Sequence, residues 1–175
     1  MMSDQQLIEL TLDGDWKAFK ELVVRYEGKV AGVVQSMLGK TPEAEDVGQE
    51  VFVRFYESLK KFRGESALGT YLVRIAINLS LNELKKRRRQ LQVFVHDEAG
   101  HLVGGSDDRF DLRELLDLEI NRLEPEFKAV LTLRLREGYS TEETAEILAI
   151  PLGTVLSRLA RAQQKLRNRL STQLT

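Results

Sequence analysis

Residues 44–90 read AEDVGQEVFVRFYESLKKFRGESALGTYLVRIAINLSLNELKKRRRQ, and this stretch decides the fold. Its first part predicts an amphipathic helix, because apolar residues recur at helical spacing. The predicted buried stripe contains Val47, Val51, Phe52, Phe55, Leu59 and Phe62. A second, mostly acidic stripe contains Asp46, Gln49 and Glu50. The segment Arg63-Gly64-Glu65-Ser66 predicts a turn, and Ser66 is expected to cap the following helix.

The second helix of this stretch is predicted to be largely buried, because apolar residues cover most of its circumference. They are Leu72, Val73, Ile75, Ala76, Ile77, Leu79 and Leu84. Only a narrow strip remains polar, and it contains Thr70, Arg74, Asn78, Asn82 and Lys85. The helix then runs into KKRRR at 85–89, five consecutive cations without an acid.

Upstream of this stretch, two further helices are expected. Asp4 is expected to cap the first, and Asp13-Gly14-Asp15 to end it. Trp16 begins the second and is interpreted as a packing residue. Residues 1–90 therefore predict one helical domain with its own core.

The second predicted domain covers residues 112–175 and contains a helix-turn-helix. Ser140-Thr141-Glu142-Glu143 is a capping box that opens a short helix, and Pro151-Leu152-Gly153 precedes a longer one. Five basic residues and no acid follow residue 147. An α-helix fits the major groove of DNA, where arginine bonds guanine edges or holds phosphates. The alternative is a solvated amphipathic helix without a ligand.

Between the two domains, residues 91–111 predict a flexible linker, because they lack a sustained period and contain Gly100, Gly104 and Gly105. Residues 1–90 have net charge +2, residues 91–112 have −4 and residues 113–175 have +1. An acidic connector thus separates two mildly basic halves. His96 and His101 in the linker have the wrong spacing for a metalloprotease motif.

Composition narrows the class of protein further. The chain of 175 residues has no cysteine, a formal net charge of −1 and only 3 prolines. With no strand-type alternation, we expect an all-α fold. No secretory signal and no run of about 20 apolar residues is present, so we expect no membrane insertion and a cytoplasmic location. No metal site, cofactor or catalytic set is predicted, and we expect the protein not to be an enzyme.

The order of these motifs resembles a known family. Four stretches resemble the second conserved region of bacterial sigma factors, in the small extracytoplasmic-function (ECF) group of the sigma-70 family. They are AEDVGQEVF, LKKFRGES, TYLVRIAINLSLN and KKRRR. LEPEFKAVLTLRLREGYSTEETAEILAIPLGTVLSRLARAQQKLR resembles the fourth region. The resemblance implies a transcription initiation factor that binds core RNA polymerase and directs it to promoters. It also implies that an anti-sigma factor is a possible partner.

By this resemblance, residues 1–90 bind polymerase and read and melt the −10 promoter element. Asp46, Gln49 and Glu50 would bind the clamp helices of the polymerase beta-prime subunit. Asn78 would lie at the pocket for a flipped base, whose Watson–Crick edge an amide can read. The residues expected on −10 DNA are Arg63, Ser66, Thr70, Tyr71, Arg74, Asn78, Lys85 and Arg88.

Also by resemblance, the helix-turn-helix reads the −35 element. The residues expected on this DNA are Thr154, Ser157, Arg158, Arg161 and Lys165. Two positions depart from the family pattern: Leu156 stands where relatives usually have Lys or Arg, and Thr144 where an apolar residue is usual.

Two other functions are compatible with parts of the pattern. A stand-alone helix-turn-helix regulator would bind duplex operators without polymerase, as a dimer on a palindrome. A helical adaptor would use the acidic face for a protein partner. Two of the predicted site residues also have a structural alternative. In it, the Asn78 amide forms hydrogen bonds with nearby backbone, and the Tyr71 ring packs in the core.

Overall fold

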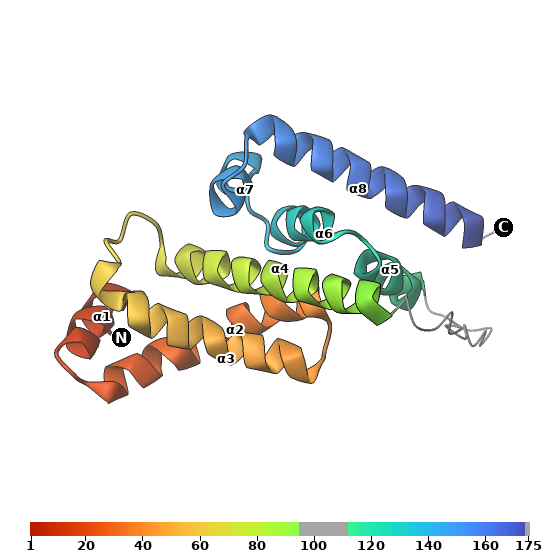
Figure 1. Ribbon diagram of the computed structural model, residues 1–175. Helices are drawn as coiled ribbons and strands as arrows, with labels where there is room; N and C mark the ends of the chain where they lie inside the picture. Colours follow the sequence, from red (N-terminus) through yellow and green to blue (C-terminus); the bar gives the residue numbers. More distant parts are fainter. Residues whose placement is uncertain (95–111, 174–175) are drawn as a thin grey trace. The chain divides into compact units, whose positions relative to one another are not determined.

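The structure, a computed structural model, describes residues 1–94 and 112–173. Every regular element in these ranges is a helix, as predicted (Figure 1). The chain divides into two compact units, Met1–Ser80 and Leu81–Thr175. Each unit contains its own set of packed helices and is described separately below.

The first unit is built from α1 (Asp4–Leu12), α2 (Trp16–Leu38), α3 (Pro42–Ser58), the 3-10 turn η1 (Leu59–Lys61) and the first part of α4 (Leu68–Phe94). Thr41 caps α3, and Pro42 lies in its first turn. Glu43 and Glu45 place negative charge in the same turn, where it interacts favourably with the helix dipole. Gly39 ends α2 with φ of 77°, a conformation that glycine adopts without strain.

Helix α4 extends beyond the predicted end of the first domain at residue 90 and runs to Phe94. Residues 85–93 are mostly Lys, Arg, Gln and Leu, which favour helix, and no Gly or Pro interrupts them. The remainder of the predicted linker, 95–111 with both histidines, lies outside the described residues.

Asp4 does not cap α1 as expected. Ser3 is the cap, and it forms a reciprocal capping box with Gln6. The Asp4 carboxylate instead bonds Arg25 of α2 at 2.6 Å and accepts from the Tyr26 hydroxyl. Burial and this carboxylate raise the pKa of Tyr26 to about 12, so these contacts join α1 to α2 while the phenol stays protonated at neutral pH.

The core of the first unit lies where α1, α2, α3 and the start of α4 meet. Its fully buried side chains include Leu7, Leu22, Val33, Met37, Val51, Phe55, Leu72 and Ile77. The predicted stripe of α3 thus points inward at Val51 and Phe55. Of the polar strip of α4, Asn78, Asn82 and Lys85 are exposed as predicted, whereas Thr70 and Arg74 are partly buried.

The second unit contains the remainder of α4, α5 (Leu112–Asn121), α6 (Pro125–Leu131), the π-helical turn η2 (Thr132–Arg136), α7 (Thr141–Leu148) and α8 (Leu152–Gln173). A core cluster joins α6 to α8 through Leu131, Ala162 and Leu166, with Phe127 and Leu159 packed against it. The capping box predicted at Ser140 and Glu143 is confirmed.

Within the described residues, Thr144 of α7 is fully buried and its hydroxyl has no hydrogen-bond partner. Thr144→Val keeps the shape and removes the buried polar group, so we expect it to stabilise the second unit by about 1 kcal/mol. Scanning calorimetry of the full chain measures this change. The matched control is Thr11→Val, because the Thr11 hydroxyl donates to the Leu7 carbonyl at 2.7 Å. That variant should gain nothing; equal gains in both variants would contradict the explanation.

In the parts of the chain that the structure describes, no helix is long and apolar enough to span a bilayer.

Candidate nucleic-acid interface

The polar strip of α4 is a continuous line of side chains on one helix face. Thr70, Arg74 and Asn78 follow one another at intervals of four residues, and Lys85 and Arg88 continue the line as exposed cations. At 1.5 Å per residue, the line is about 27 Å long from Thr70 to Arg88.

Asn78 is exposed, and its amide makes no hydrogen bond within the described residues. It is not satisfied by nearby backbone, so the structural alternative for this residue is wrong. Its neighbours Ala76 and Ile77 are fully buried, which anchors the backbone that presents the amide. Arg74, one turn earlier, is partly buried, and its Nε atom has no partner in the described part of the chain.

Tyr71 packs into the first unit. Its ring lies 4.9 Å from Phe62 and 6.3 Å from Phe55, centre to centre, and its hydroxyl donates to Ser58 Oγ at 2.9 Å. These contacts give the ring a structural place beside the polar strip, whichever role it has toward DNA.

The loop before α4 frames one end of the strip. Arg63 is exposed and Ser66 is partly buried. Helix α4 begins at Leu68, one residue later than a Ser66 cap requires, so that expectation is wrong. At Gly69 a side-chain Cβ would stand 3.2 Å from the Tyr26 ring, which explains a glycine at this close approach.

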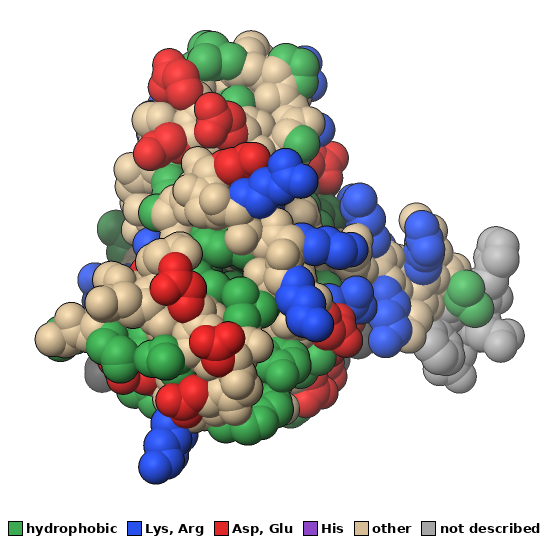
Figure 2. Space-filling view, turned by 90° about the vertical axis from the view of Figure 1, so that its left-hand side faces the viewer, with side chains coloured by type: hydrophobic (Ala, Val, Ile, Leu, Met, Phe, Trp, Pro, Cys, Tyr) green, Lys and Arg blue, Asp and Glu red, His purple; other side chains and the backbone are tan. Residues whose placement is uncertain are grey.

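A pair of surface aromatics lies in the same unit. Trp16 stacks on Tyr56 of α3 with ring centres 5.0 Å apart, yet the tryptophan remains 64% exposed. Figure 2 shows hydrophobic side chains at the surface beside Asp and Glu side chains. Trp16 is therefore partly a packing residue, as interpreted, and partly a surface residue.

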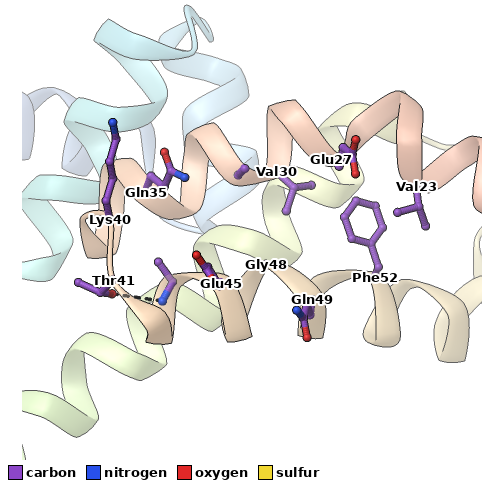
Figure 3. Close-up of a pocket in the computed structure, with 12 residues that line it drawn as sticks. Val23, Glu27, Val30, Gln35, Lys40, Thr41, Glu45, Gly48, Gln49 and Phe52 are labelled. Carbon is purple, nitrogen blue, oxygen red and sulfur yellow. Dashed lines mark hydrogen bonds between the residues drawn. The ribbon is translucent and has the colours of Figure 1, made fainter.

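The acidic stripe of α3 lies beside a hollow between α2 and α3 with a volume of about 510 Å³ (Figure 3). Gln49 and Gly48 line it from α3, and Phe52 projects from α3 toward Val23 of α2. Gln49 and Asp46 are exposed. Glu50 is partly buried and pairs with Arg54 at 2.7 Å, so a partner cation must compete with Arg54 for it.

The helix-turn-helix consists of α7, a short turn and α8. Ala149 in the turn adopts the left-handed conformation, with φ of 52° and ψ of 46°, and Ile150 bonds back to the Ala145 carbonyl at 3.1 Å. Pro151 precedes α8, and its carbonyl accepts from Thr154 at 2.9 Å. This turn sets the angle between the two helices.

Because Ala149 occupies a conformation that disfavours a Cβ atom, we expect Ala149→Gly to stabilise the second unit by about 0.5–1 kcal/mol. The calorimetric midpoint of that unit should rise. Ala145→Gly, inside α7, is the control and should lower the same midpoint because glycine weakens a helix interior. A lower midpoint for Ala149→Gly would show that the turn does not carry this strain.

In α8, Val155, Ala162 and Leu166 are buried, and Ser157 and Arg161 are exposed on the outer side. Thr154 and Arg158 are partly buried. Among the described residues, neither Arg158 nor Arg161 has an ion-pair partner. Both guanidinium groups are thus available to an anionic ligand.

Lys165 differs from these arginines, because its ammonium is engaged inside the unit. It lies 2.5 Å from Glu124 Oε1 at the start of α6 and 5.3 Å from the centre of the Phe127 ring. The hydrogen bond from Lys165 lowers the pKa of the Glu124 carboxyl. Lys165 must leave this pair to reach a phosphate, so its predicted DNA role has a competing structural one.

Comparison with known proteins assigns the family. Residues 22–90 match the model of sigma-70 region 2, and residues 113–166 match that of sigma-70 region 4. The chain is 37% identical to the ECF RNA polymerase sigma-E factor of Haemophilus influenzae, over 97% of this chain and 96% of that protein. The chain is an ECF sigma factor of the sigma-70 family. A sigma factor directs RNA polymerase to promoters, and this transcription initiation role is the function of the chain.

Other relatives of this sigma factor agree in length and family. The RNA polymerase sigma-H factor of Pseudomonas aeruginosa is 37% identical over 92% of this chain and 90% of that protein. The ECF sigma-E factor of Escherichia coli K12 is 35% identical over 97% and 95%. The family resemblance drawn from the sequence is thereby confirmed.

Solved structures support the fold of this sigma factor. The sigma factor RpoE of Bartonella quintana, solved with the anti-sigma factor NepR, matches with a TM-score of 0.68 at 23% identity, covering 89% of this chain and 98% of that one. CnrH, solved with the cytosolic domain of CnrY, matches with a TM-score of 0.68 at 24% identity, covering 97% of each chain.

Proposed function

We propose that the two domains of this sigma factor divide promoter recognition between them. Residues 1–90 bind core polymerase and read and melt the −10 element, residues 91–111 act as a tether, and residues 112–175 read the −35 element. The observation that carries this proposal is the pair of family matches, each on a separate set of helices.

The polymerase contact assigned to Asp46, Gln49 and Glu50 is supported by the exposure of the first two residues and by the hollow beside them. An acidic and amide-bearing face suits a partner helix rich in arginine, such as the beta-prime clamp helices. Complementary charge of this kind gives orientation and association rate more than affinity.

For the −10 element, the exposed amide of Asn78 would read an extruded base, with Thr70 and Arg74 beside it. Arg63 and Ser66 would frame the pocket from the loop, and Lys85 and Arg88 would hold the backbone phosphates. Tyr71 would border the pocket from its packed position. Extruding a base costs a few kcal/mol, which a fitted site can offset.

For the −35 element, α8 would enter the major groove with Ser157 facing the bases. Arg158 and Arg161 would contact guanine edges or phosphates, and Thr154 would contact the backbone beside them. Lys165 would contribute only after exchanging Glu124 for a phosphate.

This function implies further properties of the protein. The chain acts in the cytoplasm, where polymerase and promoters meet, and it contributes binding energy rather than a catalytic group or a cofactor. An anti-sigma factor that covers both DNA-binding surfaces is a partner implied by the family.

In vitro transcription with purified core polymerase and a pool of genomic fragments tests the proposal. The holoenzyme should start transcription at sites that share one upstream and one downstream element, and the chain without core should bind these fragments weakly. Strong binding to duplex DNA without polymerase, with no start-site selection, would contradict the proposal.

A further inference from the structure

The recognition helix leaves two leucines about half exposed. Leu152 in the first turn of α8 is 41% exposed, and Leu156 one turn later is 49% exposed. Residues four apart lie side by side on a helix. The two leucines therefore form one apolar strip, called here the apolar edge of α8.

The apolar edge lies on a defined side of the helix. At 3.6 residues per turn, Gly153, Ser157 and Ala160 occupy the middle of the outward face. The apolar edge flanks this face on one side, and the cationic edge of Thr154 and Arg158 flanks it on the other. The residues in the middle of this face are small or lack a side chain. The leucine side chains therefore project farther from the helix axis than those residues do.

The chemistry of the major groove restricts what the apolar edge can meet. Phosphates and most base-edge atoms are polar, and a leucine placed against them would displace water without replacing its hydrogen bonds. The apolar group that the groove presents is the C5-methyl group of thymine. The first turns of a recognition helix are also the part that reaches the base edges.

We infer that Leu156, assisted by Leu152, makes the −35 readout selective for thymine through its methyl group. This inference rests on the proposed function of α8. Leu156 is then a specificity residue: this chain recognises one or two adjacent thymines by apolar contact. The occupant of the apolar edge is thus duplex DNA, and the absence of any acid between Ile147 and the end of the chain favours an anionic ligand there.

The test uses the full chain bound to core polymerase. Promoter duplexes randomised over the upstream element are selected with this holoenzyme, and the selected duplex is remade with deoxyuridine replacing thymidine at one position at a time. Deoxyuridine pairs identically but lacks the methyl group. For the unmodified protein we expect binding to weaken about three- to fivefold at one or two adjacent positions, the effect of losing one buried methyl.

For Leu156→Ala, the affinity for the thymidine duplex divided by the affinity for the deoxyuridine duplex should fall to about one at those positions. The preference of this variant for the other bases of the selected element should be unchanged. The matched control is Leu135→Ala, because Leu135 is 63% exposed in η2, outside the recognition helix. Its ratio should equal that of the unmodified protein.

The outcomes separate the two levels of the argument. If the holoenzyme selects no upstream element, the proposed function of α8 fails and the inference fails with it. If an element is selected but deoxyuridine binds as well as thymidine everywhere, the inference alone is overturned. It is also overturned if Leu156→Ala weakens all duplexes equally and keeps the ratio, since the leucine would then contact polymerase rather than a methyl group.

Discussion

Replacing both Arg158 and Arg161 by alanine is expected to weaken holoenzyme binding to its selected promoters by between about thirtyfold and about ten-thousandfold when both bond guanine edges. Both guanidinium groups lie on α8 without an ion-pair partner in the described parts of the chain, so neither substitution breaks an ion pair there. Each arginine that bonds a guanine edge contributes about 1–3 kcal/mol. If the two arginines contact phosphates instead, the double variant should lose about two units in the magnitude of the slope of log K against log salt concentration.

Competition binding at several salt concentrations distinguishes these two modes. Arg113→Ala is the control, because Arg113 is an exposed arginine on α5 of the same unit, outside the helix-turn-helix. It should leave promoter affinity within about twofold of the unmodified protein, the range of ordinary surface substitutions. Unchanged transcription in the Arg158 and Arg161 double variant would favour the helical adaptor, in which these cations have no ligand.

Asn78→Ala is expected to reduce promoter opening by about ten- to a hundredfold while leaving the affinity for core polymerase unchanged. The amide is exposed, makes no hydrogen bond within the described residues and sits on a well-packed helix, so its loss should not unfold the domain. Losing the hydrogen bonds that hold an extruded base removes energy needed to offset unstacking. Permanganate reactivity of thymines in the −10 region measures opening directly.

Asn82→Ala is a demanding control for this prediction. Asn82 presents the same exposed amide one turn farther along the same face of α4, so it tests position rather than chemistry. We expect it to open promoters nearly as well as the unmodified protein. Equal loss in both variants would show that the strip binds strand backbone and that no single amide reads a base.

The candidate interface could be predicted from sequence wherever one helix alone determines which side chains share a face. The strip of Thr70, Arg74 and Asn78 is such a case, because a period of 3.6 residues places them together regardless of what packs behind them. The roles of Tyr71 and Lys165 could not be predicted in the same way. Tyr71 meets Phe55 and Ser58, and Lys165 meets Glu124, and these partners come from other helices.

The helices, the capping box at Ser140 and the family could be predicted from the sequence alone, because these depend on local periodicity and on motifs within short stretches. Only the tertiary structure decided which polar groups are already engaged and which are available to a ligand. Asp4 illustrates the difference: its position before a helix predicted a cap, yet its carboxylate binds Arg25 and Tyr26 of the next helix. Capping is a local interaction, whereas an ion pair between helices depends on how their faces meet, which no single stretch of sequence encodes.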